Sequence, residues 1–443
     1  MSANKLEVIH YKDRRCKHSE SVDLKINNKT LISPVFAPRL KNANELNLFL
    51  EIQSNNVPIH LSAYVVRLFD IGKTLGYRLK KASQTNLLGE TTDAVFSSSL
   101  ERDLILIDPA LEYLFYIANM SRLEHSPYVS SLIRAYARRF IKDRENVKKA
   151  GKEAPISANK SREIMHTNFW SCMYKEANKR MKLIRDTFHA EMKYRADLFI
   201  PPVPLVTSPY LLDVAIFMNE KSQAYVEGKI ECADYFVLKP HILTNDSMMA
   251  TIKQYIENSP SPLTIFKFKN LNLNHEDLSL ERRAFRDLLA ELSFLSQHVE
   301  NKAFAFFEVG NQTFVSALSS VAFVSTAFNL DREDRRRHTE VTRFASWYDP
   351  DSMTLRNKKT FETVIENNNG NIPCHCPVCS SSPSFIDNEF TEYNRKTKMH
   401  YLHRREQEMK EIYEAIEKQD ALMGFDKIRR SSLKNLVDVI PRS

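Results

Sequence analysis

Three cysteines lie close together in a chain whose other cysteines are scattered. They are Cys374, Cys376 and Cys379, in the sequence Ile-Pro-Cys-His-Cys-Pro-Val-Cys. Zinc takes four soft or borderline ligands in a tetrahedron, and closely spaced cysteines on a turn can supply three of them. The fourth must come from further along the chain, where His400 and His403 are the candidates. Four protein ligands close the coordination sphere, so the pattern predicts a structural zinc ion.

The alternative is a chance cluster of free thiols near an ordinary histidine. Clustered cysteines in a cytosolic protein favour metal binding over disulfides. His375 lies between two of the cysteines, where the tight turn disfavours it as a ligand. Cys16, Cys172 and Cys232 are isolated, and isolated cysteines usually behave as small buried apolar residues. We assign these three no role.

The composition is that of a soluble globular protein with a modest positive charge. A formal net charge of +8 at pH 7 favours partners rich in phosphate, although proteins that bind no nucleic acid often carry such an excess. Only 8 glycines occur, and the phosphate-cradling glycine motifs are missing. No apolar run is long enough to predict a membrane span, and the polar N-terminal sequence lacks a signal-peptide core. We therefore expect a cytoplasmic protein.

Short apolar runs rich in β-branched and aromatic residues predict strands through the first three quarters of the chain. They cover residues 31–37, 57–63, 104–108, 196–206, 234–239, 263–268, 303–309 and 321–326. Amphipathic stretches of helical period lie between most of them, so the strands should pair in parallel through crossover helices. This alternation predicts an α/β fold. The leading architecture is a (β/α)8 TIM-type barrel, with an open doubly wound sheet as the alternative.

Two segments interrupt this alternation and define the expected domains. Residues 136–195 are basic and helical in character, and we expect them to form an insertion between two parts of the barrel, 20–135 and 196–330. Residues 331–443 hold the cysteine cluster and a charged helical tail. They are predicted to form a zinc-binding subdomain with C-terminal helices.

The cysteine cluster and its surroundings resemble the zinc module of tRNA-guanine transglycosylases, above all the archaeal branch. In that family Cys-x-Cys-Pro-Val-Cys is followed further along by a histidine that opens a helix containing Glu-Met-x-x-Ile. Here His400-Tyr401-Leu402 precedes Glu408-Met409-Lys410-Glu411-Ile412, which favours His400 over His403. Residues 353–373 are similar to the family's strand pair before the zinc loop, and residues 25–38 are similar to its N-terminal hairpin.

The resemblance covers residues 20–65 and 300–425 and implies a (β/α)8 barrel enzyme that exchanges bases in nucleic acid. In this family a carboxylate attacks the anomeric carbon of the ribose and displaces guanine, which leaves a covalent sugar–enzyme intermediate. A 7-deazaguanine then enters with help from a second carboxylate, as in retaining glycoside chemistry. Family members commonly dimerise through the zinc region, so the resemblance also implies a homodimer.

The resemblance places the catalytic carboxylates at the ends of barrel strands. Asp108 occupies the position of the family's first catalytic aspartate, although Pro109-Ala110-Leu111 replaces a Ser-Gly-Gly-Phe step. An aspartate there is also a common helix N-cap. The family nucleophile lies in an Asp-x-Phe-Asp sequence, whereas this chain has Ala322-Phe323-Val324-Ser325. Ser325 therefore stands at the nucleophile position without a carboxylate.

A carboxylate from another strand could replace the missing nucleophile. Asp197 and Asp213, on or just after the strand 196–206, are the candidates, and each is more often a strand-end or helix-cap residue. The family's glycine-rich base pocket is also missing, since residues 263–270 lie where a Gly-x-x-x-Gly segment is expected. Side chains would then occupy space that the base needs.

Two groups of basic residues are candidates for binding nucleic acid. Arginines after the last barrel strand and within the insertion could contact phosphates, and nearby aromatics could stack an unpaired base. A solvated loop or helix face is the alternative. The residues are Arg332, Arg335, Arg336 and Arg337 after the strand and Arg138 and Arg139 in the insertion.

These features predict a zinc-containing transglycosylase that exchanges guanine in nucleic acid, DNA preferred over tRNA, for a 7-deazaguanine such as 7-cyano-7-deazaguanine. The basic insertion is closest to the DNA-directed branch of the family, so accessory proteins of a modification cluster are expected partners. The missing carboxylate at position 325 leaves a second interpretation, a non-catalytic nucleic-acid-binding subunit or recognition protein. A third is a barrel enzyme with an unrelated substrate.

Overall fold

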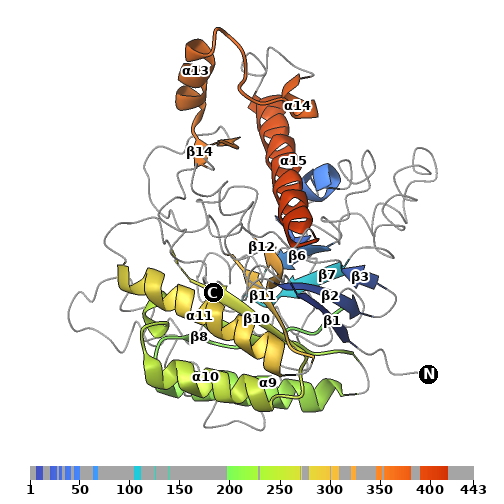
Figure 1. Ribbon diagram of the computed structural model, residues 1–443, viewed down its shortest axis with the longest axis vertical. Coiled ribbons are helices and arrows are strands. Elements are labelled where there is room, and N and C mark those ends of the chain that lie inside the picture. The colour runs from blue at the N-terminus through green and yellow to red at the C-terminus, as the bar shows by residue number, and fades with distance from the viewer. Residues whose placement is uncertain are drawn as a thin grey trace.

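The protein has a mixed α/β fold with parallel sheets (Figure 1). The structure is a computed structural model with two parallel sheets, an antiparallel N-terminal sheet and a C-terminal module built around a long helix. It describes residues 6–12, 20–26, 29–31, 35–40, 44–49, 63–67, 104–110, 125, 138, 197–227, 230–269, 271, 279–299, 301–308, 321–325, 346–351, 354–380 and 390–417.

Six parallel strands form the larger sheet, in the order β4-β12-β11-β10-β9-β8. The strands β9, β10 and β11 are buried at every residue and rich in phenylalanine and aliphatic side chains, as expected for strands covered on both faces. The strands are β4 (Val35–Phe36), β8 (Leu205–Val206), β9 (Asp234–Leu238), β10 (Leu263–Phe268), β11 (Ala303–Phe307) and β12 (Val321–Ser325).

Three helices connect successive strands of this sheet (Figure 1). They are α9 (Pro209–Val226), α10 (Asp246–Asn258) and α11 (Ser279–His298). The first begins where the Ser208 hydroxyl accepts a hydrogen bond from the Leu211 N–H, with a proline in the first turn. The second begins where Asn245 Oδ1 accepts from the Met248 N–H at 3.0 Å.

Alternation along β10 separates an apolar face from a charged one. Phe268 packs edge-to-face on Phe285 of α11 with ring centroids 5.5 Å apart, and Phe266 stacks on Phe268. Neighbouring residues of a strand point to opposite faces, so Lys267 is directed away from α11. A lysine in a fully buried strand therefore faces the interior on the other side of the sheet, where its charge needs partners.

The second parallel sheet has the order β5-β6-β7. It is joined to the first sheet by a short chain segment at one edge and by isolated β-bridges at the other. Its strands are β5 (Arg39–Leu40), β6 (Ala63–Arg67) and β7 (Leu104–Asp108). Only Ala37 and Pro38 separate β4 from β5. Residues 198–199 form single parallel bridges with Leu106 of β7 and with Cys232, just before β9. Each parallel sheet thus continues into the other.

The sequence predicted most strand positions. The strands at 104–108 and 263–268 are confirmed residue for residue. Of the strand predicted at 57–63 only Ala63 is described, and it begins β6, which ends at Arg67. Residues 57–62 lie outside the described residues. The (β/α)8 arrangement and the domain boundaries stay predictions.

The N-terminal sheet consists of three antiparallel strands that pack on the end of the larger sheet. They are β1 (Glu7–Lys12), β2 (Glu20–Ile26) and β3 (Lys29–Leu31). Val22, Leu24 and Ile26 are buried and alternate with the less buried Asp23 and Lys25, which is the period of a strand with one covered face. These residues belong to β2, and this strand contacts β12. The antiparallel pair of β2 and β3 overlaps the first part of the hairpin-like segment 25–38.

The C-terminal module is a hairpin followed by three helices. They are β13 (Trp347–Asp349), β14 (Thr354–Arg356), α13 (Lys358–Asn367), α14 (Pro377–Ser380) and α15 (Phe390–Glu417). The strand pair expected within residues 353–373 is wrong, since only β14 is a strand and α13 follows it. Asn357 Oδ1 accepts the Thr360 N–H at 2.8 Å and so starts this helix, while β13 supplies the second strand.

The long helix α15 joins this module to the parallel sheets. It contacts β13, β4 and β2. Tyr401 packs edge-to-face on Phe36 of β4, with ring centroids 6.1 Å apart. The Lys398 ammonium binds the Glu45 carboxylate at 2.6 Å, and Glu45 is nearly buried. One apolar and one charged contact therefore hold α15 against the N-terminal part of the core.

A buried acidic group lies at the start of β9. Asp234 Oδ1 accepts hydrogen bonds from Gln223 Nε2 at 2.5 Å and from the Tyr255 hydroxyl at 2.9 Å. Its Oδ2 is buried without a hydrogen-bond partner among the described residues. Burial raises the pKa of Asp234 to about 6, although hydrogen bonds from Ser259, Tyr255 and Gln223 and the charge of Lys302 oppose the shift.

Replacing this carboxylate should remove a pH-dependent destabilisation. The folded protein holds the Asp234 proton up to about pH 6, whereas an unfolded aspartate releases it near pH 3.9, about the reference value. Stability should therefore fall by roughly 2–3 kcal/mol as pH rises from about 4 to about 6, and should stay lower above it. Asp234→Asn should abolish this fall in urea unfolding, whereas exposed Asp287→Asn on α11 should retain it. The same fall in both variants would contradict the assignment.

Candidate metal centre and buried charge cluster

The cysteines are presented by a tight loop and one short helix. The Cys374 N–H donates to the Ile372 carbonyl at 2.8 Å, and the Ser380 N–H donates to the Cys376 carbonyl at 3.0 Å. These turns bring Cys374, Cys376 and Cys379 onto one side of the loop. The helix α14 contacts α15, which carries the fourth candidate ligand, His400.

The four side chains converge on one point. His400 Nδ1 lies 3.7 Å from the sulfur of Cys374 and 3.3 Å from those of Cys376 and Cys379. All four ligand atoms lie within 4.8 Å of one another, and all four residues are buried. A tetrahedral zinc ion, with bonds of about 2.3 Å to sulfur and about 2.0 Å to nitrogen, separates its ligand atoms by roughly 3.5 Å. The cluster can hold a metal ion such as zinc.

The surroundings of His400 prepare it to bind a cation. Its Nε2–H donates to the Tyr348 carbonyl at 2.6 Å, which leaves the Nδ1 lone pair directed at the sulfurs. Trp347 stacks on the imidazole with ring centroids 5.1 Å apart. Burial lowers the pKa of His400, but Cys374 and Cys376 outweigh it and raise the pKa to about 9. Without a metal ion Nδ1 would therefore hold a proton, and a divalent ion bound to the lone pair would take the place of that proton.

The structure selects one ligand from the three histidines considered in the sequence. His375 is exposed. His403 is buried one turn further along α15, and its Nδ1 lies 3.9 Å from Glu406. Only His400 joins the three cysteines in the described part of the chain. The predicted set of Cys374, Cys376, Cys379 and His400 is the one that converges.

A buried ion pair supports the centre from the other side of β13. Arg405 binds Glu408 Oε2 at 2.6 Å, and the Tyr348 hydroxyl donates to Glu408 Oε1 at 2.7 Å. The guanidinium of Arg405 lies 4.6 Å from the Tyr348 ring and 5.4 Å from the Tyr401 ring. Burial raises the pKa of Tyr348, so its hydroxyl stays a hydrogen-bond donor. These contacts position the carbonyl that orients His400.

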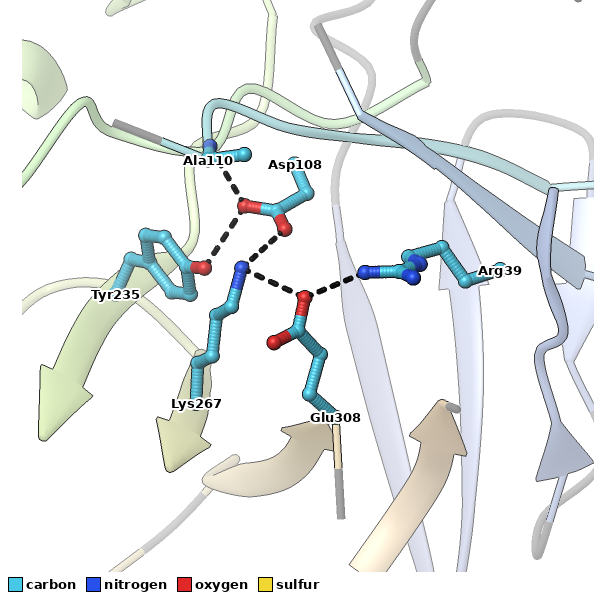
Figure 2. Close-up of polar contacts among 6 residues, drawn as sticks. All are labelled: Arg39, Asp108, Ala110, Tyr235, Lys267 and Glu308. Carbon is cyan, nitrogen blue, oxygen red and sulfur yellow. Dashed lines mark hydrogen bonds and ion pairs between the residues drawn. The ribbon is translucent and has the colours of Figure 1, made fainter. Parts of the chain in front are cut away.

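A second polar group, the charge cluster, consists of Arg39, Asp108, Lys267 and Glu308 (Figure 2). The Lys267 ammonium lies 2.7 Å from Asp108 Oδ2 and 3.0 Å from Glu308 Oε1. Arg39 binds the same Glu308 oxygen at 2.8 Å. Asp108 Oδ1 accepts from the Tyr235 hydroxyl and the Ala110 N–H, both at 2.9 Å. The exposed side-chain fractions are 0% for Lys267, 1% for Asp108, 2% for Arg39 and 7% for Glu308.

Parallel strands bring these side chains to one edge. Asp108 is the last residue of β7, and Glu308 directly follows β11. The register pairs Lys267 of β10 with Phe307, so the lysine lies beside the carboxyl end of β11. Glu308 has φ +57°, a left-handed conformation that is rare outside glycine. Functional groups of parallel α/β proteins lie at the carboxyl ends of strands, which makes the charge cluster the candidate active site.

The other predicted catalytic residues lie in different places. Asp197 Oδ2 binds Lys29 Nζ at 2.8 Å and accepts the Ile105 N–H at 2.9 Å, so it lies near the start of β7, away from Asp108. Asp213 lies exposed on α9. Ser325 ends β12 and pairs with Phe307, which places its backbone beside the end of β11. The structure brings neither aspartate together with Asp108.

Most of the basic residues predicted to bind nucleic acid lie outside the described residues. These are Arg139, Arg332, Arg335, Arg336 and Arg337. Arg138 is helical and exposed, and the rest of the insertion 136–195 is outside the described part of the chain. Their role stays a prediction. No helix in the described part of the chain is both long and apolar enough to cross a membrane.

Sequence reasoning missed Arg39, Lys267 and Glu308. One signal was present, because Lys267 is a charged residue inside an otherwise apolar run, LTIFKF. Such a lysine in a strand covered on both faces requires a buried anion. Glu308 and Arg39 carry no comparable signal, since both stand where a strand meets a loop and charged residues are common there.

Neither the protein-family models nor the curated proteins include a match to this sequence. The function is therefore argued from the chemistry of the two centres.

Removing one cysteine should empty the metal centre. The purified protein should contain about one metal ion per chain by elemental analysis, since the donor set is complete. Cys376→Ser should reduce the content to below about a tenth and lower the melting temperature. The matched control His403→Gln, one turn from His400, should keep the ion. Full metal content in Cys376→Ser would contradict the ligand assignment.

Removing the shared cation should destabilise the fold. Lys267→Met keeps the length of the side chain but leaves two buried carboxylates facing each other, which should cost about 3–5 kcal/mol of unfolding free energy. The exposed control Lys359→Met on α13 should change it by less than about 0.5 kcal/mol. Urea titration followed by circular dichroism measures both. Equal effects of the two variants would show that the buried ion pairs do not support the fold.

Proposed function

We propose that this protein is a zinc-containing transglycosylase on a (β/α)8 barrel. It would exchange guanine in nucleic acid, DNA preferred over tRNA, for a 7-deazaguanine such as 7-cyano-7-deazaguanine. The observation that carries the proposal is the pair of buried carboxylates, Asp108 and Glu308, held on one lysine at the carboxyl edge of parallel strands. The resemblance of the cysteine module to transglycosylases supplies the reaction type.

The strand connections support a closed barrel. The continuous segment 35–40 contains β4, which pairs with β12, and β5, which pairs with β6. At the other side, residues 198–199 bridge β7 and the residue before β9. Such continuity at both edges supports closure, because a closed barrel leaves no edge strand exposed. Eight parallel segments, with α9, α10 and α11 outside, fit the arrangement predicted from the sequence.

Two neighbouring carboxylates match the chemistry of glycosidic exchange. Asp108 Oδ2 and Glu308 Oε1 contact the same ammonium at 2.7 and 3.0 Å. Their oxygens therefore lie at most about 6 Å apart, a range that includes the separation of about 5–5.5 Å at which one carboxylate attacks and the other transfers protons. Sequence reasoning provided Asp108 for one of these roles, and the structure supplies a neighbour for the other.

The metal centre has a structural role in this proposal. Three thiolates and one imidazole form the closed donor set that zinc prefers, with no coordination position left for a substrate. The ion would join the loop 374–379 to α15 and, through Tyr348, to β13. It would thereby hold the C-terminal module on the core without taking part in the exchange.

The expected partners follow from charge and from the reaction. A net charge of +8 attracts a polyanion such as DNA or tRNA, and the predicted arginines would contact its phosphates. A base within a duplex must leave the stack before an enzyme can act on it. A homodimer, accessory proteins of a modification cluster and a cytoplasmic location belong to the same proposal.

One observation favours the alternative of a non-catalytic recognition protein. Two carboxylates and two cations neutralise one another in the charge cluster, and their side chains are almost completely buried. A buried network of this kind can have a purely structural role, in which it makes the core adopt one specific arrangement. In that case the scaffold would bind nucleic acid without exchanging a base.

A base-exchange assay separates these two functions. Protein is mixed with 7-cyano-7-deazaguanine and with guanine-labelled DNA or guanine-labelled tRNA in separate reactions. We expect label release from DNA, and Asp108→Asn should slow it by about 10³-fold because proton transfer is lost. Exposed Asp287→Asn on α11 is the control and should keep the wild-type rate. Binding without release, by protein with a full metal complement, would establish the recognition protein instead.

A further inference from the structure

We propose that Glu308 is the nucleophile of the exchange reaction, an inference that rests on the proposed function. The position aligned with the family nucleophile is Ser325, at the end of β12. Glu308 follows the neighbouring strand, β11, whose last residue pairs with Ser325. Compared with that position, the carboxylate would lie one strand further around the carboxyl edge of the sheet and one residue beyond the end of the strand.

The backbone at Glu308 is held in a costly conformation. Its φ of +57° lies in the left-handed region, where a residue with a Cβ atom is strained by about 1–3 kcal/mol. Such strain persists where the surroundings impose it, and it is concentrated at functional sites. Because Phe307 pairs with Lys267, the next residue of a regular strand would point to the opposite face of the sheet, away from Lys267. The turned backbone brings the Glu308 carboxylate to Lys267 instead (Figure 2).

The charges around the two carboxylates distinguish their roles. Glu308 Oε1 is contacted by two cations, Arg39 at 2.8 Å and Lys267 at 3.0 Å. Asp108 shares one of these cations and otherwise accepts from a hydroxyl and a backbone N–H. Opposite charges favour the ionised form of a carboxylate. We therefore assign the attack to Glu308, which two cations contact, and the proton transfer to the Asp108–Lys267 pair.

The reaction balances with these groups. A Glu308 oxygen forms a bond to the anomeric carbon as the bond from that carbon to guanine breaks. The bonding electron pair leaves with guanine, whose ring nitrogen takes a proton held by the Asp108–Lys267 pair. The incoming 7-deazaguanine returns a proton to that pair, and its nitrogen attacks the same carbon and expels the Glu308 carboxylate. The covalent ester removes the negative charge of Glu308 while the proton given to guanine removes one positive charge from the Asp108–Lys267 pair, so the cluster stays balanced until the second step restores both.

Trapping the covalent intermediate tests the inference. Full-length protein is incubated with guanine-containing DNA or tRNA without a second base, denatured, and examined by gel shift and peptide mass mapping. We expect a sugar-linked adduct on the peptide that contains Glu308. Glu308→Gln, which keeps the size and an oxygen acceptor for Arg39, should form no adduct and lose about 10³-fold in exchange rate. Glu257→Gln, an exposed glutamate on α10, should stay within about twofold of wild type.

The outcomes separate this inference from the function on which it rests. An exchange rate in Glu308→Gln equal to that of the wild type, or an adduct mapped to the peptide containing Ser325, would overturn Glu308 as the nucleophile. The proposed transglycosylase function would not be affected by either result. The absence of exchange and of adduct in wild type, on both polymers, would overturn both. Mapping the wild-type adduct does not depend on a variant that folds, and the metal content of Glu308→Gln reports whether that variant does.

Discussion

The buried ammonium of Lys267 constrains the centre of this protein. It stands in a strand with no exposed residue, where an unpaired charge would cost several kcal/mol. Asp108 from β7 and Glu308 after β11 offset that cost, so strands from different parts of the chain must meet at one edge. A shift of β10 by one residue would turn the lysine toward α11. The register of the sheet and the geometry of the candidate active site therefore depend on the same contact.

The C-terminal module depends on a comparable convergence. One ring nitrogen of His400 faces the three cysteines, and the other donates to the Tyr348 carbonyl. Trp347 stacks between this imidazole and Phe361. The buried pair of Arg405 and Glu408 fixes the strand that provides this carbonyl. A metal ion at this point would join elements whose own apolar cluster, which includes Trp347, Phe361 and Tyr393, is small.

The same charge cluster can stabilise a fold or carry out a reaction. The difference lies in whether the charges of its individual groups change. As a structural network it would keep two anions and two cations in permanent balance. As a transglycosylase it would change two charges together, because Glu308 loses its negative charge on esterification while the Asp108–Lys267 pair gives up a proton, and Arg39 keeps its charge beside them. Preorganised cations that cost no rearrangement during the reaction are what such a step needs. The left-handed backbone at Glu308 is easier to understand in an active site than in a purely structural turn.

The sequence by itself determined what local chemistry and periodicity can encode. The spacing of Cys374, Cys376 and Cys379 predicted a metal loop, and apolar runs such as 104–108 and 263–268 predicted strands at their observed bounds. Helix N-caps were harder to recognise in the sequence. Asn357 caps a helix, α13, in a segment where a strand was expected. Only the tertiary structure decided that Lys267 joins Asp108 to Glu308, because these residues lie far apart in the sequence. No local pattern specifies such a meeting, since it follows from the order and register in which parallel strands pair.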